Sequence, residues 1–403
     1  MSFEQGLSGL NAASKNLDVI GNNVANSTTV GFKGSHAVFA DVYAQSFGGS
    51  GAAASGIGTQ VAAVQADFGQ GNITVTSNPL DVAINGGGFY VLDNNGATTY
   101  SRNGQFHLDA NGYVVNATGA NVSGYGVDAT GAIVGSTPGP LQVSSASINP
   151  TVTTKAATGV NLDSRSAIIA TPFSIANPAS YNNSSSMTVY DSLGNPHTLA
   201  SYYVKTAANA WTVYGAMDGT ALAAPMGTLP FNATGTLPVP TPAFAVSAPL
   251  VSGATTPFTF TLDMSSSTQF GSAFGVNSLT QDGATAGSLA GYSVGTDGTL
   301  LGRYSNGQTR SLGQLVLANF ANDNGLQPLG GNAFAETAAS GQPLVGTPGS
   351  GSLGVLQSGA VEESNVDLTQ QLVDMITAQR VYQANAQTIK TQDQVMNTLV
   401  NLR

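Results

Sequence analysis

The strongest constraint on the fold is a spacing of apolar residues that recurs at both ends of the chain. Residues 3–24 and residues 368–400 place apolar side chains at alternating steps of four and three. The positions that carry the stripe are Phe3, Leu7, Leu10, Leu17 and Val24, then Leu368, Leu372, Met375, Tyr382, Ile389, Met396 and Val400. This heptad-like spacing predicts two helices that can pair with each other and with copies of themselves. Ordinary helices that pack on a core are the alternative.

The C-terminal stripe predicts the longer helix. No Gly or Pro interrupts it, and a helix over 368–403 would be about 50 Å long at about 1.5 Å per residue. Asn365 or Asp367 can cap its start, because a side-chain oxygen there accepts from free backbone N–H groups. Glu362 and Glu363 come just before, where the helix dipole favours acidic groups. The apolar face is wider than a two-stranded seam needs, so we expect several neighbours.

The composition excludes several classes of function. Only 8% of the residues are charged, against about 25% in an ordinary globular protein. The net charge is −10 and the 11 Lys and Arg are scattered, so we expect neither nucleic-acid binding nor membrane insertion. The absence of cysteine excludes disulfides, thiolate metal ligands and cysteine nucleophiles. This balance is typical of a secreted, β-rich structural protein.

The sequence contains no pattern that is typical of catalysis or cofactor binding. His36, His107 and His197 are far apart, so we interpret each as a surface residue. No glycine-rich phosphate loop and no G-x-S-x-G motif occurs. We therefore predict that the chain is not an enzyme and expect no catalytic residue, cofactor or metal. Because the N-terminus lacks the charged and apolar regions of a signal peptide, we expect a cytosolic chain or export without a cleaved signal.

The middle of the chain is typical of β-structure. Alternating or continuous apolar runs predict strands in four segments, which are 78–92, 187–205, 211–215 and 312–320. Glycines beside asparagines predict tight turns, since Gly adopts positive φ without steric cost. The pairs are Asn103-Gly104, Asn111-Gly112 and Gly194-Asn195. Residues 48–58 are rich in Gly, Ala and Ser and are expected to form a flexible linker.

Two long motifs occupy the chain ends. They are SGLNAASKNLDVIGNNVANSTTVGFK at 8–33 and SNVDLTQQLVDMITAQRVYQANAQTIKTQDQVMNTLVNLR at 364–403. Together they resemble the signature of the flagellar rod and hook proteins. The matching residues are Asn22, Asn23, Ala25, Asn26, Gly31, Phe32, Lys33, Ser364, Asn365, Val366, Asp367, Gln379, Arg380 and Asn385. Segments 101–119 and 187–205 resemble the inner and outer β domains of the hook proteins in this family.

The resemblance implies an α+β multidomain fold. Both chain ends would form a terminal α-helical coiled-coil domain, and two mainly β domains would follow, one nested inside the other. The expected bounds are 1–24 plus 364–403 for the helical assembly domain, 25–70 for a partly ordered linker region, 71–145 plus 285–358 for the inner β domain and 146–284 for the outer β domain.

The resemblance also implies a structural role. A flagellar hook subunit would self-assemble into a short curved tube, a flexible universal joint that transmits motor torque to the filament. Expected partners are copies of the chain, the distal rod protein, the hook-filament junction protein, the hook cap protein and the type III export apparatus. The expected location is extracellular, in the flagellum, after export without a cleaved signal peptide. A distal rod subunit is the near alternative and a secreted adhesin the distant one.

Overall fold

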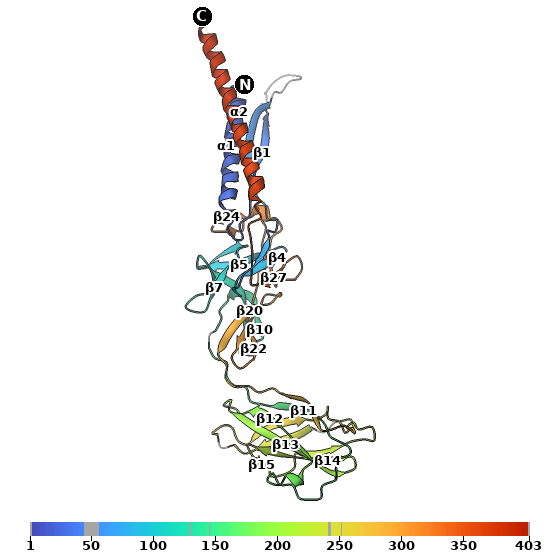
Figure 1. Ribbon diagram of the computed structural model, residues 1–403. Helices are drawn as coiled ribbons and strands as arrows, with labels where there is room; N and C mark the ends of the chain where they lie inside the picture. The colour runs from blue at the N-terminus through green and yellow to red at the C-terminus, as the bar shows by residue number, and fades with distance from the viewer. Residues whose placement is uncertain are drawn as a thin grey trace. The chain divides into compact units, whose positions relative to one another are not determined.

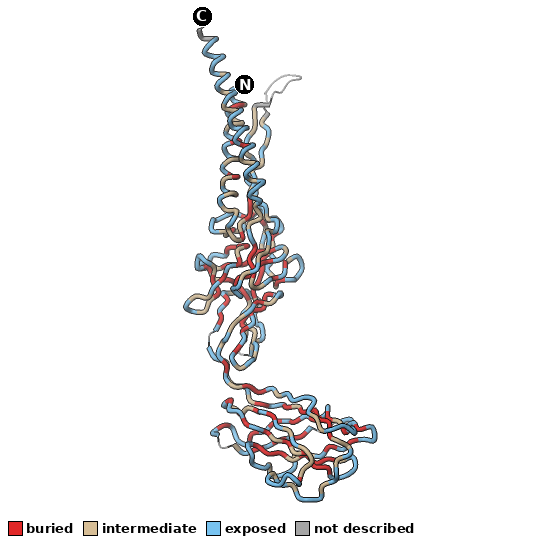
Figure 2. The backbone as a smooth tube through the Cα atoms, viewed as in Figure 1, coloured by how far each residue is buried: buried red, intermediate tan, exposed pale blue. Residues whose placement is uncertain are grey.

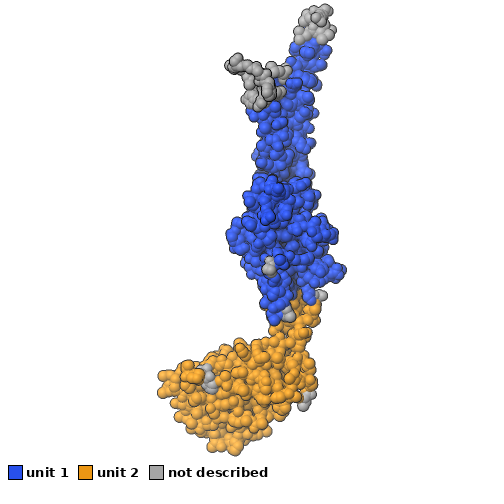
Figure 3. All heavy atoms as spheres, turned by 180° about the vertical axis from the view of Figure 1, so that it is seen from behind, with its two compact units in different colours: residues 1–144, 291–302, 310–403 blue, residues 145–290, 303–309 orange. Residues whose placement is uncertain are grey.

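The chain divides into two compact units, which Figure 3 colours separately. The computed structural model describes residues 2–43, 56–128, 130–144, 146–240, 243–250 and 252–401. Unit 1 comprises residues 1–144, 291–302 and 310–403, and unit 2 comprises residues 145–290 and 303–309. Unit 2 is therefore inserted within the sequence of unit 1. The finer domain edges given above stay predictions.

The two ends of the chain form one helical layer in unit 1. Helix α1 spans Ser2–Ala25 and helix α2 spans Leu368–Asn401. They lie side by side (Figure 1) and run antiparallel, because Gly6 lies beside Ile389 while Asn23 contacts Gln371. The predicted combination of paired terminal helices with β-rich domains is confirmed.

A β-hairpin packs along α1. Strand β1 (Ser35–Tyr43) pairs antiparallel with β2 (Gly56–Ala66), and the Thr59 N–H donates to Ser8 Oγ at 3.3 Å. The hairpin lies within the expected linker region 25–70, where strand pairing satisfies the backbone groups that a loop would leave to water. Most of the expected flexible segment 48–58 lies outside the described residues, and its last three residues begin β2. We call α1, α2 and this hairpin the arm.

The remainder of unit 1 is β-structure, and we call residues 73–144, 291–302 and 310–362 the body. Three of its strands, β20, β21 and β22, include residues of unit 2. The strands are β3 (Ile73–Val75), β4 (Val82–Asn85), β5 (Phe89–Asn94), β6 (Ala97–Ser101), β7 (Phe106–Leu108), β8 (Val114–Asn116), β9 (Asn121–Val127), β10 (Ile133–Pro140), β20 (Leu289–Val294), β21 (Thr299–Tyr304), β22 (Thr309–Leu315), β23 (Leu317–Asn319), β24 (Gln327–Gly330), β25 (Ala333–Ala335), β26 (Leu344–Gly346), β27 (Val355–Ser358) and β28 (Ala360–Glu362). A short 3₁₀ helix spans Asp323–Gly325.

One large sheet organises the body. This sheet has 13 strands: eight follow the path β20-β21-β22-β9-β5-β6-β25-β24, and β7, β8, β10, β23 and β26 pair off this path. The strands β27 with β4 and β28 with β3 form separate antiparallel pairs. The core of the large sheet is aromatic: the ring of Phe68 lies edge-on to Phe89 at 5.4 Å and to Phe334 at 5.3 Å between centroids. Since Phe68 follows β2 directly, this contact fixes the point where the arm meets the body.

Unit 2 consists of two sheets that share one core. Its strands are β11 (Lys155–Asn161), β12 (Asn183–Tyr190), β13 (Pro196–Ala207), β14 (Ala210–Met217), β15 (Thr220–Ala221), β16 (Gly227–Pro230), β17 (Ala243–Ala248), β18 (Phe258–Asp263) and β19 (Gly275–Gln281), with a 3₁₀ helix at Pro178–Ser180. One sheet has the order β17-β18-β11-β19, and the other has β12-β13-β14-β15 with β16 on β14. Buried and exposed residues alternate along β17 and β18 (Figure 2), as expected for strands with one face in a core.

All four segments predicted as strands contain strands, and the tight turns predicted at Asn111-Gly112 and Gly194-Asn195 are confirmed, with Gly112 and Gly194 at φ +82° and +81°. Asn111-Gly112 lies in a five-residue turn in which Asp109 Oδ1 accepts from the N–H groups of Asn111 at 2.9 Å and Tyr113 at 2.7 Å. Gly194-Asn195 lies in the same kind of turn, which starts at Asp191. The controlling residue is thus the Asx three positions before the glycine, a turn stabilised by side chain and backbone together.

Asn103-Gly104 forms no hairpin turn, so that prediction is wrong. It connects β6 to β7, which pair with other strands. A Cβ at Gly104 would overlap the carbonyl oxygen of Val82. The glycine is therefore needed for close backbone approach and not for positive φ.

His197 is not the surface residue that the sequence suggested. It is 9% exposed in unit 2, with Nδ1 2.6 Å from Asp218 Oδ2 and Nε2 3.2 Å from Asp191 Oδ2. Asp191 also accepts from Ser252 Oγ at 2.9 Å, and the Phe258 ring lies beside the imidazole. Burial lowers the pKa of His197, but the hydrogen bonds to Asp218 and Asp191 outweigh it and raise the pKa above its ordinary value.

The stability of unit 2 should therefore decrease in alkali. The raised pKa of His197 gives stability that is complete below the unfolded value of about 6.5 and is lost as the pH rises through the folded pKa. Trp211 is the one tryptophan and is fully buried in unit 2, so its fluorescence can follow urea unfolding of this unit in the whole chain. We expect the urea midpoint to fall from pH 6 to pH 9 more steeply in wild type than in His197→Gln. Equal slopes would contradict this, and His107→Gln, an exposed histidine of unit 1, is the control.

Candidate assembly site

Apolar side chains of both helices remain exposed although the helices are paired. On α1, Phe3 and Leu7 are 50% and 43% exposed. On α2, Figure 2 shows mostly exposed backbone, and among the side chains described up to residue 398 eight large apolar ones are 37 to 58% exposed. They are Leu368, Leu372, Val373, Ile376, Val381, Tyr382, Val395 and Met396. Burying such a side chain fully stabilises by about 1.5–3 kcal/mol, so the arm presents a large unused contact surface.

The contact between α1 and α2 uses small and polar residues. A Cβ at Gly6 would lie 3.2 Å from Ile389, and a Cβ at Gly9 would lie 2.9 Å from Asn385 Nδ2. Ala378 is buried on the same side of α2, one heptad from both Asn385 and Gln371. Glycine and alanine allow close approach of the two backbones, and Ile389 fits against Gly6 in this seam.

Only part of the predicted apolar stripe therefore lies in the seam between α1 and α2. Met375 and Ile389 are half-buried, and so are Leu10, Leu17 and Val24 on α1. Leu368, Leu372, Tyr382 and Met396 are exposed, and so are Phe3 and Leu7. The side chain of Val400 lies outside the described residues. The role of these positions in assembly stays a prediction.

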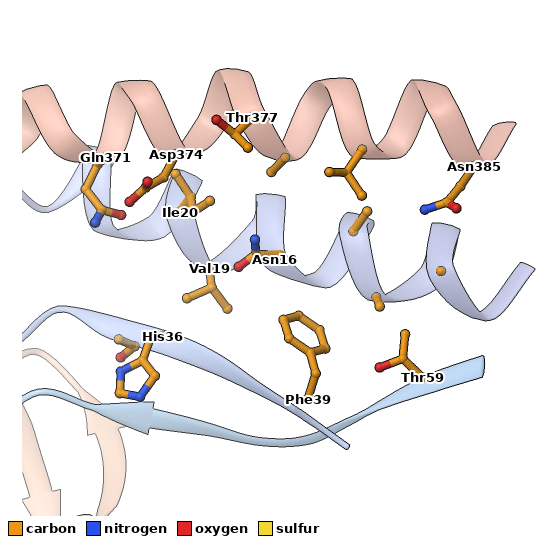
Figure 4. A pocket seen from close by; sticks show the side chains of 16 residues that line it. Asn16, Val19, Ile20, His36, Phe39, Thr59, Gln371, Asp374, Thr377 and Asn385 are labelled. Carbon is orange, nitrogen blue, oxygen red and sulfur yellow. The ribbon is translucent and has the colours of Figure 1, made fainter. Parts of the chain in front are cut away.

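A groove of about 570 Å³ lies between α1, α2 and the hairpin. Figure 4 shows Asn16 and Val19 of α1 on the side of Phe39 of β1, and Ile20 between the two helices, with Asp374 and Thr377 on α2. Phe39 is 41% exposed, so its ring is open to solvent in the single chain. The groove adds a concave apolar surface beside the convex one of α2.

A buried ion cluster joins the arm to the body. Lys33 Nζ lies 2.7 Å from Glu362 Oε1, and Arg102 Nε lies 3.0 Å from Glu362 Oε2, with the three side chains at most 4% exposed. The expectation that Glu362 serves the dipole of α2 is wrong, because it ends β28 and its carboxylate points into this cluster. Burial lowers the pKa of Lys33 and the Arg102 charge lowers it further, against the effect of Glu362.

Asparagines of the family motif tie the helices to the same region. Asn23 accepts from the Ser35 N–H at 2.9 Å and donates to Gln371 Oε1 at 3.1 Å. Asn365 Oδ1 accepts from the Gly34 N–H at 2.8 Å. Asp367, and not Asn365, caps α2, because its Oδ1 accepts from the Thr369 N–H at 2.8 Å.

The other motif residues fall into two groups. Asn22 and Asn26 close the end of α1, where the Asn26 side chain donates to the Asn22 carbonyl at 2.9 Å. Gly31 has φ +71°, and a Cβ there would lie 2.6 Å from Asn103 N. The remaining ones sit around the junction or on α2: Phe32, Ser364 and Val366 are half-buried, whereas Ala25, Gln379 and Arg380 are exposed.

Sequence reasoning identified Lys33 but missed its partners Arg102 and Glu362. The sequence carries a signal that Glu362 is buried and paired. Charged residues are only 8% of the chain, and Glu362 follows an apolar pair at the end of a strand. Within the described ranges, no group of three His, Cys, Asp or Glu is placed to hold a metal ion. None of the helices described here is long and apolar enough to cross a membrane.

Comparison with known families places the chain among proteins of the flagellar rod and hook. Four family models match it: "Flagella basal body rod protein" over 3–33, "Flagellar hook protein FlgE/F/G D1 domain" over 83–163, "Flagellar basal body protein FlaE D2 domain" over 161–284 and "Flagellar basal body rod FlgEFG protein C-terminal" over 357–402. The matches thus reach from the start of α1 to the end of α2.

Full-length relatives identify the family of the chain within the flagellar rod and hook proteins. The chain is 46% identical to the flagellar hook protein FlgE of Escherichia coli and to that of Salmonella typhimurium, each over 100% of both chains. It is 36% identical to the hook protein of Rhizobium meliloti over 100% of this chain and 98% of the relative. The chain belongs to the flagellar hook protein FlgE family. These relatives are structural proteins and not enzymes.

A solved structure shares the fold. The crystal structure of Helicobacter pylori flagellar hook protein FlgE2 superposes with a TM-score of 0.54 at 15% identity, over 72% of this chain and 100% of that chain. At this identity the match supports the fold alone.

The glycines of the N-terminal segment give a matched pair of substitutions. Gly31→Ala should destabilise unit 1 by about 1–2 kcal/mol or more, because alanine disfavours positive φ and its Cβ would meet the Asn103 backbone. Gly21→Ala should stabilise α1 by about 0.5–1 kcal/mol, since its Cβ would meet nothing within 4 Å. Urea unfolding followed by far-UV circular dichroism measures both changes. Equal stability of Gly31→Ala and wild type would contradict the assignment.

Proposed function

We propose that this chain, a structural subunit of the flagellar hook, self-assembles through its arm into a curved tube that works as a flexible universal joint. The observation that carries the proposal is the exposed apolar surface of α2 in a helix pair that is already formed. At about 100° per residue, six of the eight exposed apolar residues found among the described side chains of α2 spread over about 220° of its surface away from α1, whereas Tyr382 and Met396 lie on the side that Ala378 turns to α1. One neighbour cannot cover so wide a surface, so each α2 contacts several copies.

The contacts would be heterologous, with one surface of a copy against a different surface of the next. Such contacts do not close into a ring unless the rotation allows it, and otherwise build an open helix of subunits. The groove beside Phe39 and the convex face of α2 are two unlike surfaces of one chain. This pairing of concave and convex surfaces supports a tube rather than a closed dimer.

Bending needs contacts that break and reform between copies. Apart from Asp263 at the end of β18, the exposed residues of β17 and β18 are small and uncharged, with Ala243, Ala245 and Ser247 on one strand and Thr259 and Thr261 on the next. Small uncharged side chains offer weak contacts without ion pairs that would fix one register. We infer that unit 2 supplies the contacts that change as the tube bends.

The remaining roles rest on the family. We propose that the chain meets the distal rod protein at one end of the tube, the hook-filament junction protein at the other and the hook cap protein during assembly. Export would use the type III apparatus without a cleaved signal, to the extracellular part of the flagellum. A chain without cysteine carries no disulfide that could block passage in an unfolded state.

Electron microscopy of the purified full-length chain at high concentration tests the proposal, beside a copy that lacks 1–24 and 364–403. We expect curved tubes from the full-length chain alone. Straight tubes would favour a distal rod subunit. Absence of polymer even with hook fragments as seeds would contradict self-assembly.

Two substitutions on α2 separate assembly from folding. Leu372 is 45% exposed, so Leu372→Asp should leave the helix content of the single chain unchanged while it abolishes tubes, because a buried unpaired charge is unfavourable. Ile389 packs on Gly6, so Ile389→Asp should also loosen α1 from α2. Sedimentation measures assembly, circular dichroism measures helix content, and Thr220→Asp on the exposed short strand β15 of unit 2 is the control. Normal tubes from Leu372→Asp would remove that face from the interface.

A further inference from the structure

Three chain segments meet where the arm joins the body within the described part of unit 1, and we call them the crossings. The first is residues 26–34, a loop of the arm between α1 and β1 that contacts the body, where Asn332 donates to the Val30 carbonyl at 2.8 Å. The second is residues 67–72, which lead from β2 into the body, and the third is residues 363–367, which lead from the body into α2. If each moved independently, the arm could twist relative to the body.

The Glu362 side chain binds the first two crossings, and its own backbone continues into the third. Its Oε1 accepts from Lys33 Nζ of the first crossing at 2.7 Å and from the Gly71 N–H of the second at 2.8 Å. Glu362 itself leads into the third crossing, and its backbone carbonyl accepts from the Gly31 N–H at 2.8 Å. Lys33 Nζ also donates to the Gly69 carbonyl at 2.7 Å, which ties the first crossing to the second directly.

Asn365 repeats this arrangement from the third crossing. Its Oδ1 accepts from the Gly34 N–H, and its Nδ2 donates to the Asp67 carbonyl at 2.8 Å and the Gly69 carbonyl at 3.2 Å. Two side chains thus join the same three segments twice.

Arg102 anchors the cluster in the body. Its guanidinium holds Glu362 Oε2 through Nε at 3.0 Å, and Nη1 donates to the carbonyls of Gly86 and Gly88 at 2.9 and 2.6 Å. A buried ion cluster contributes little net stability compared with well-packed apolar residues, but it fixes geometry because charged hydrogen bonds are directional. In a chain with 8% charged residues, this use of three charges points to a geometric role.

We propose that Lys33, Glu362 and Asn365 form a clamp that makes the arm and the body turn as one, so that torque reaches the body without twist at the crossings. This rests on the proposed tube function. Lys33, Glu362 and Asn365 are then positioning residues of the joint. The tube bends at contacts between copies, while the crossings keep their geometry.

Lys33→Met is the first test variant, because it frees the first crossing and leaves a balanced Arg102–Glu362 pair in the body. Asn365→Ala is the second, since it removes only hydrogen bonds at a half-buried site and leaves the ion cluster intact. Glu363→Gln is the control, because Glu363 is the exposed neighbour of Glu362.

Hydrogen exchange on the single chain is the first readout. In both test variants, peptides that cover the crossings should exchange at least about tenfold faster, as expected when a buried charge pair or paired amide is lost. Exchange in unit 2 should not change, and Glu363→Gln should match wild type. Unchanged exchange at the crossings in both variants would overturn the clamp.

The second readout is the stiffness of assembled tubes, obtained by cryo-electron microscopy from the spread of tube curvature and of subunit twist. We expect tubes of Asn365→Ala and Lys33→Met to show at least about twofold larger variance of twist than wild type, since each has lost ties at the crossings. Faster exchange with unchanged twist variance would overturn the mechanical role and leave a purely structural one. Failure of wild type to form tubes would overturn the proposed function instead, and exchange would still decide whether the crossings are clamped.

Discussion

The buried carboxylate of Glu362 is the group on which the geometry of unit 1 depends. It accepts from a lysine near the N-terminus, an arginine in the body and a backbone N–H after the hairpin, and so joins residues that are 260 to 329 positions apart in sequence. A charge buried without partners is strongly unfavourable, so the native arrangement is the one in which all three donors are present together. The chain ends are thereby brought into register before any contact with another copy.

The seam between α1 and α2 explains why the apolar stripe faces outward. Gly6 and Gly9 let the helices approach closely, and the polar groups of Asn23, Gln371 and Asn385 occupy the same side. Such a seam buries little apolar area, so most of the hydrophobic free energy of the arm is still available for contact with neighbours. A leucine-rich seam would have used that free energy within one chain.

Heptad spacing and local turn chemistry predicted the two helices and the β-rich middle, because these depend on neighbouring residues, whereas the terminal motifs were recognised by their resemblance to a known family. The face of α2 that meets α1 could not be predicted, since glycine and asparagine carry no apolar signal. His197 and Glu362 were misplaced for a related reason: their partners Asp218, Lys33 and Arg102 are distant in sequence. Asn103-Gly104 shows a third case, in which the glycine serves close approach to Val82 and not a turn.

Directional and non-directional interactions occupy different places in this molecule. Hydrogen bonds and ion pairs lose strength within small changes of distance and angle, and they gather at the crossings between arm and body. Apolar contacts depend mainly on buried area and tolerate sliding, and the unused apolar surface lies on the outside of the arm. A tube built from such subunits can change the contacts between copies at little cost while the geometry within each copy is kept. The polymer can therefore bend although each subunit stays rigid at the crossings, where its hydrogen bonds and ion pairs are concentrated.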